Sequence, residues 1–92
     1  MRLPLIKHIS EFIENNDQDF IEETLEVLEY LTEFEGLSDS EIDSLGEIIS
    51  NLYGALEVEK SVEAGLPRKE ALNAFMKRVQ QSIDKYCLRN FT

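Results

Sequence analysis

The sequence has very little of the residues that carry redox and metal chemistry. Its 92 residues include no tryptophan, one histidine and one cysteine, Cys87. A single cysteine excludes an intramolecular disulfide and any site built from four thiolates. A di-metal site of the helical-bundle type needs Glu-x-x-His on two helices, which one histidine cannot supply. We find no signature of a catalytic, cofactor-binding or metal-binding site.

Positive charge is also scarce, because 9 Lys and Arg residues face 19 Asp and Glu residues and leave a net charge of −10. Such a field argues against general nucleic-acid binding and against binding to an anionic membrane surface. No apolar run approaches the ~18 residues that span a membrane, and the first residues lack the apolar segment of a signal peptide. We therefore expect a soluble, cytoplasmic protein with neither a nucleic-acid nor a membrane partner.

The charge is distributed unevenly along the chain. Residues 1–65 include 17 acidic and 3 basic residues, a net charge of −14. Residues 66–92 include 2 acidic and 6 basic residues, a net charge of +4. Complementary fields of this kind can fix how two elements or two subunits are oriented.

Four helices account for the hydrophobic pattern, with expected ranges of about 4–15, 18–34, 39–64 and 67–87. Pro4 suits the first turn of a helix, because its missing N–H would be unpaired there anyway. Ser38 and Glu41 have the spacing of a capping box at the start of the third helix. Gly36 is expected to end the second helix in the left-handed conformation, and Gly65 to stop the third.

The predicted fold is all-α, an antiparallel four-helix bundle with a long central third helix, in one domain spanning residues 1–92. A chain this short buries roughly 60–65% of its unfolded surface, so its stability rests on a modest core. Association with a second chain is one way to add to that core. With 42% hydrophobic residues, the chain has enough apolar material to fold.

The expected second helix has an apolar stripe and an acidic stripe on opposite sides. The apolar stripe comprises Phe20, Ile21, Thr24, Leu25, Val27, Leu28, Leu31 and Phe34. The acidic stripe could be a solvated face, a docking face for a basic partner or a carboxylate metal site, and comprises Glu22, Glu26, Glu29 and Glu33.

The expected third helix has apolar residues around more than half of its circumference. At about 100° per residue, one face holds Ile42, Leu45, Ile49, Leu52, Tyr53 and Leu56. A second face, turned away from the first, holds Ala55, Val58 and Val62. The change of face falls beside Gly54, which costs about 1 kcal/mol in a helix interior. The helix could bend there, a neighbouring backbone could approach closely, or the glycine could be a tolerated passenger.

We expect this helix to be the centre of the structure, because its apolar surface is too wide for one neighbour. One face would pack on the first and second helices, and the other would meet the fourth helix, another subunit or both. A partner would then contact the candidate interface residues Gly46, Tyr53, Gly54, Val58 and Val62, with Tyr53 as the best anchor.

The basic residues of the fourth helix allow two interpretations. They could form an anion site, or they could pair with the acidic helices within one chain or across a dimer; they are Arg68, Lys69, Lys77, Arg78, Lys85 and Arg89. Lys85 and Arg89 flank Cys87 and would lower the pKa of its thiol. We nevertheless interpret Cys87 as an inert half-buried residue, and His8 as a residue at the surface or at the edge of the first helix's apolar face.

Four segments of the chain stand out: LPLIKHISEFIENND, ETLEVLE, EIISNLYGALEVEK and KEALNAFMKRV. Together they resemble a family of small all-helical bacterial proteins known only as a domain of unknown function, over roughly residues 1–85. The resemblance implies an all-helical fold and lends no catalytic residue. It associates the chain with thioredoxin and peroxiredoxin neighbours, which implies a redox-linked protein partner. The terminal YCLRNFT lies beyond the family pattern.

These observations favour a small non-enzymatic module for protein–protein interaction or regulation that forms a homodimer. The alternative is a protein that binds a small molecule or an anion, using the bases of the fourth helix around a pocket with Tyr53. An uncovered apolar patch on the single chain would favour the first hypothesis, and a pocket with converging polar groups would favour the second.

Overall fold

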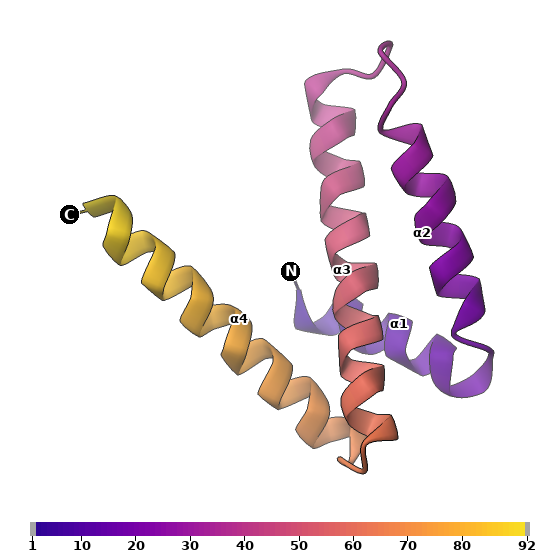
Figure 1. The fold of residues 1–92 in the computed structure, drawn as a ribbon, viewed down its shortest axis with the longest axis vertical. Helices are drawn as coiled ribbons and strands as arrows, with labels where there is room; N and C mark the ends of the chain where they lie inside the picture. Colours follow the sequence, from indigo (N-terminus) through magenta and orange to yellow (C-terminus); the bar gives the residue numbers. More distant parts are fainter. Residues whose placement is uncertain (1, 92) are drawn as a thin grey trace.

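The structure, a computed structural model, describes the backbone of residues 2–91 and the side chains of residues 2–79. It contains four helices (Figure 1): α1 (Leu3–Asn15), α2 (Asp19–Leu31), α3 (Asp39–Glu63) and α4 (Arg68–Phe91). Residues 2–91 contain no strand. The predicted all-α helical bundle with a long third helix is therefore confirmed.

The ends of α3 follow the local signals in the sequence. The backbone N–H of Ser38 donates to the Glu41 carboxylate at 3.0 Å, and the Glu41 N–H donates to the Ser38 hydroxyl at 3.2 Å, so the predicted capping box forms. The hydrogen bond from the Ser38 N–H lowers the pKa of Glu41. Gly65 lies just beyond the helix at φ 113°, a conformation that glycine adopts without a steric cost.

The expectation for Gly36 is wrong. Helix α2 ends at Leu31, three residues earlier than predicted, and Gly65 is the one residue of positive φ in the described backbone. The Thr32 hydroxyl donates to the Glu29 carbonyl at 2.6 Å, a local bond that competes with continuation of the helix. Gly36 instead leaves room for the ring of Phe34, because an added Cβ would lie 2.6 Å from that ring.

The helices form a flat molecule with extents of 42 × 40 × 18 Å. In Figure 1, α2 and α3 run side by side in opposite directions and form a helical hairpin. Helix α1 crosses behind the C-terminal half of α3, and α4 turns back from the end of α3 and then diverges from it. The N-terminal half of α3 therefore has α2 as its main neighbour, whereas the C-terminal half has neighbours on several sides.

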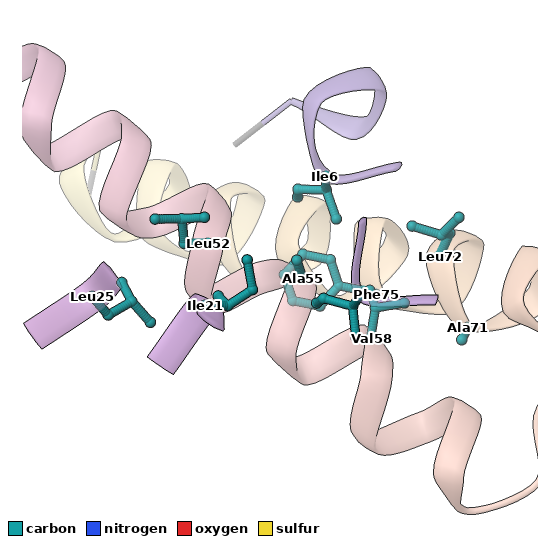
Figure 2. Packing of buried hydrophobic residues seen from close by; sticks show 10 residues of the cluster. Ile6, Ile21, Leu25, Leu52, Ala55, Val58, Ala71, Leu72 and Phe75 are labelled. Carbon is teal, nitrogen blue, oxygen red and sulfur yellow. The ribbon is translucent and has the colours of Figure 1, made fainter. Parts of the chain in front are cut away.

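The core lies where α1 and α4 meet the C-terminal half of α3. Figure 2 shows Ile6 of α1 and Phe75 of α4 converging on Ala55 and Val58 of α3. Ile6, Ala55 and Val58 are fully buried, and Phe75 is 6% exposed. The other buried apolar residues are Ile13, Ile21, Leu25, Leu52, Ala71 and Leu72.

At Gly54, side chains of both α1 and α4 lie close to α3. A Cβ at this position would lie 3.1 Å from Cδ1 of Ile6 and 3.1 Å from Cζ of Phe75, closer than ordinary van der Waals contact. Of the three explanations for this glycine, close approach is therefore correct, but the neighbours are side chains rather than a backbone. Gly46 has no atom within 4 Å of its would-be Cβ, so its lack of a side chain serves no packing within the chain.

The same side of α3 becomes polar toward its N-terminus. One, two and three turns before Gly54, the residues on that side are Ser50, Glu47 and Asp43. Glu47 is already paired with the guanidinium of Arg2 at 2.9 Å. A helix packed against Gly54 therefore has no apolar surface to contact toward the N-terminus of α3. Helix α4 diverges from α3 along this length.

We expect alanine at the two interior glycines of α3 to have different effects on stability. Gly46→Ala should raise the free energy of unfolding by about 1 kcal/mol, because alanine has the higher helix propensity and the site is open. Gly54→Ala gains the same helix propensity but compresses Ile6 and Phe75. Its free energy of unfolding should therefore be lower than that of Gly46→Ala by at least about 1 kcal/mol. Thermal unfolding followed by circular dichroism measures both, and an equal gain from both substitutions would refute the packing role of Gly54.

Candidate interaction surface

The α2–α3 hairpin leaves much of its apolar surface uncovered. Among residues 2–79, ten large hydrophobic side chains are exposed, and eight of them lie between residues 20 and 53: Phe20, Val27, Tyr30, Leu31, Phe34, Ile42, Ile48 and Tyr53. Single exposed apolar residues are normal on a protein surface. Whether these eight form a contiguous patch depends on which side of the hairpin each one occupies.

Tyr53 identifies one side of the hairpin. Its hydroxyl donates a hydrogen bond to the carboxylate of Glu29, so these two residues lie on the same flank of the α2–α3 pair. This hydrogen bond raises the pKa of Tyr53, and the nearby negative charge acts in the same direction. The contribution of this bond to stability is therefore present below the ordinary tyrosine pKa of about 10 and is lost as the pH rises through the raised value.

Four apolar residues lie on the opposite flank. On α2, Phe20, Val27 and Leu31 are turned roughly 100° from the buried stripe, on the side away from Glu29. On α3, Ile48 is turned away from the α2-facing residues in the direction opposite to Tyr53. Because the bond between Tyr53 and Glu29 fixes the first flank, these four residues share the second. We call them the apolar flank.

The apolar flank is open to solvent. Phe20 is 56% exposed, Val27 61%, and Leu31 and Ile48 each 46%. Helix α1 crosses the hairpin near the C-terminal half of α3, and at that edge the ring of Phe12 meets the ring of Phe20 edge to face with centroids 6.0 Å apart. Phe12 is itself 43% exposed and extends the flank toward α1.

A depression at the tip of the hairpin adjoins this flank. It has a volume of about 600 Å³ and is lined by Tyr30, Leu31, Glu33, Phe34 and Glu35. Leu31 belongs to both features, so the apolar surface continues from the flank onto the tip.

Arg68 accounts for one of the basic residues of the fourth helix. Its guanidinium reaches both carboxylate oxygens of Glu59 at 2.7 and 3.4 Å and donates to the hydroxyl of the buried Ser10. Its Nε lies 3.5 Å from the carboxylate of Glu14. The hydrogen bond that Arg68 donates to Glu59 raises the pKa of Arg68, against the opposing effect of partial burial. This arginine therefore ties α1, α3 and α4 together.

A groove between α1 and α4 is a second concave feature of the described surface. It has a volume of about 510 Å³, and its walls combine bases, acids and apolar side chains: Leu3, Lys7, Glu11, Glu14, Arg68, Lys69, Leu72 and Asn73. Tyr53 is absent from these walls and instead bonds to Glu29 of α2. This groove is therefore not the predicted pocket that combines Tyr53 with the bases of the fourth helix, and that pocket stays a prediction.

The comparison with known families gives a clear result for this helical architecture. The model of a family of unknown function, DUF6952, matches residues 1–84. The chain belongs to this family. The resemblance seen in the sequence is thus confirmed, and residues 85–92 lie beyond the matched part. No curated protein and no solved structure matches the chain.

The candidate interface residues predicted from the sequence lie in different environments in the structure. Gly54 and Val58 lie inside the chain's own core, and their contact with a partner stays a prediction. Val62 is half-buried and packs against the core. Gly46 and Tyr53 reach the surface, but Tyr53 lies on the flank opposite to the apolar one.

The sequence did contain a signal for the apolar flank. The eight residues interpreted as one stripe of the second helix extend over too wide an arc to face one neighbour, as in the third helix. Ile21, Leu25 and Leu28 turn toward the core, whereas Phe20 and Val27 point away from it.

The remaining polar candidates show no arrangement for metal chemistry. Among the residues that the structure describes, no three His, Cys, Asp or Glu side chains are placed to hold a metal ion. The acidic stripe of α2 is exposed, as is His8. In the described part of the chain, no helix combines the length and the apolar character needed to cross a membrane. The side chains of Ile83, Lys85, Tyr86, Cys87 and Arg89 lie outside those described.

We expect Arg68→Met to destabilise the fold by about 2–3 kcal/mol, because it leaves the Glu59 carboxylate and the Ser10 hydroxyl without their partner in a largely buried site. Arg68 is 21% exposed and Glu59 13% at their side chains. Urea unfolding measures the free energy of unfolding of Arg68→Met, Glu59→Gln and the double variant. The effect of the double variant should differ from the sum of the two single effects, which gives the coupling energy between Arg68 and Glu59.

The matched control is the exposed pair Lys60–Glu57, at 3.1 Å with side chains 73% and 50% exposed. Lys60→Met should change the free energy of unfolding by about 0–1 kcal/mol. Equal effects at the two pairs would contradict the structural role of Arg68.

Proposed function

We propose that the protein is a non-enzymatic helical module for protein–protein interaction that associates with itself. The observation that carries the proposal is the apolar flank, four large hydrophobic side chains on one side of a two-helix hairpin that are 46–61% exposed. Contiguous apolar surface of this kind marks interaction sites in soluble proteins.

The total surface area supports the same conclusion. The chain exposes 6816 Å², whereas a compact monomer of 10.6 kDa exposes about 5,500 Å². The surplus, roughly 1,300 Å² per chain, is comparable with the area that stable protein interfaces bury. The Cα radius of gyration of 14.9 Å likewise exceeds the value of about 12 Å for a compact domain of this length.

The charge distribution fits self-association as well. Two copies with a net charge of −10 each repel one another at long range. The positive segment 66–92 and the negative segment 1–65 allow a docked pair to place opposite charges together. Electrostatics would then select the orientation, and burial of the apolar flank would supply most of the affinity.

The alternative function, binding of a small molecule or an anion through the fourth helix, rests on the groove between α1 and α4. Lys7 and Lys69 line this groove, but so do Glu11 and Glu14. Arg68 is already engaged by Glu59. The groove therefore supports anion binding less well than the apolar flank of the hairpin supports binding of a protein partner. The thioredoxin-linked partner stays a prediction of the resemblance, and a cytoplasmic location in a bacterial cell is part of the proposal.

Light scattering on a sizing column tests this proposal. We expect a molar mass of twice 10.6 kDa at both low and high salt, because apolar burial depends little on ionic strength. Val27→Ser should weaken the dimer, since Val27 is exposed on the apolar flank. Tyr53→Ala, on the opposite flank, is the matched control and should leave the mass unchanged. A single-chain mass at every concentration would overturn the proposal.

A further inference from the structure

On the basis of the proposed self-association, we infer that the partner of the apolar flank is helix α4 of a second copy, exchanged reciprocally between the two chains. Four observations lead to this arrangement: the path of α4, the apolar spacing along it, the polar side of α3 that would otherwise receive it, and the dimensions and charge of the two surfaces.

Among the side chains of α4 that the structure describes, residues 68–79, several pack on the chain's own core. Ala71, Leu72 and Phe75 are buried, and Met76 and Val79 are half-buried. The helix continues to Phe91, and Figure 1 shows its backbone diverging from α3 along this length. The twelve residues after Val79 amount to about 18 Å of helix.

The apolar spacing of α4 continues past Val79, the last residue of this helix whose side chain the structure describes. Leu72, Phe75, Met76 and Val79 are spaced by three and four, and the sequence extends this spacing to Ile83 and Tyr86. A helix whose apolar stripe extends beyond its own core needs a second surface to cover that stripe.

The chain's own α3 is a poor candidate for that surface. Along the side that begins at Gly54, α3 presents Ser50, Glu47 and Asp43, and Glu47 is held by Arg2. The apolar flank lies elsewhere, between α2 and the far side of α3, where the chain's own α4 cannot reach it without leaving Gly54.

A second copy provides a surface of the right length and charge. Phe20 to Leu31 spans twelve residues of α2, or about 18 Å along the helix, which matches the projecting part of α4. The projecting residues 80–91 have a net charge of +1, from Lys85 and Arg89 against Asp84, and residues 1–65 a net charge of −14, so the contact joins opposite charges. In a dimer with two-fold symmetry, α4 of each chain covers the apolar flank of the other, so both flanks and both helices are covered.

The test uses one variant on each surface, because reciprocal exchange predicts that the two defects complement each other. Val27→Arg blocks the flank and Ile83→Arg blocks the helix. Each variant alone should have a single-chain mass, with a dissociation constant raised about 100-fold or more, because each change occurs at both contacts of the dimer. An equimolar mixture should recover dimers, since the helix of the Val27→Arg chain is intact and so is the flank of the Ile83→Arg chain.

Two matched controls carry the same new charge elsewhere. Ile42→Arg changes an exposed apolar residue of α3 outside the apolar flank, and Gln81→Arg changes a residue on the face of α4 opposite to the apolar spacing. Both should remain dimers. Circular dichroism should show that all four variants keep the helix content of the unmodified chain.

The other outcomes separate this inference from the proposed function. If the unmodified chain is a monomer, self-association itself fails. If Val27→Arg dissociates but Ile83→Arg does not, the two flanks pack on each other and the exchange is overturned. If both variants dissociate and their mixture stays monomeric, the same conclusion holds. If neither variant dissociates a chain that is dimeric, the interface lies elsewhere and the exchange is again overturned.

Discussion

The architecture depends on the missing side chain at Gly54. Two helices from opposite ends of the chain reach α3 at this residue, with Ile6 from one and Phe75 from the other, each 3.1 Å from the place a Cβ would occupy. The cost of a glycine in a helix interior, about 1 kcal/mol, is offset by burial of two large side chains, worth about 1.5–3 kcal/mol each. Ala55 and Val58 complete the contact.

The same region also determines where the core stops. Beyond Gly54, that side of α3 is polar as far as Asp43, so the three-helix contact has no apolar continuation in that direction. Helix α4 diverges, and the N-terminal half of α3 keeps α2 as its main neighbour. One change of side-chain character along one helix thus produces both a closed core and an open apolar hairpin in a chain of 92 residues.

Much of this fold could be predicted from local sequence signals, and much of the candidate surface could not. The capping box of Ser38 and Glu41 and the stop at Gly65 depend on neighbouring residues alone, and both were predictable. The division of the second helix's apolar stripe was not, because it depends on where α1 crosses. Nor could the sequence indicate which of the acidic residues would pair with Arg68, since Glu59 and Glu14 come from different helices.

The contact between Arg68 and Ser10 joins residues 58 positions apart in the sequence. The two ends of the described chain therefore complete one core, and Ile6 and Ala55 lack their cover until Phe75 is in place. During synthesis the ribosome releases α1, α2 and most of α3 before α4 becomes available, so these three helices expose their apolar faces in the meantime. Closure of the core thus waits until α4 has been synthesised and has packed on α1 and α3.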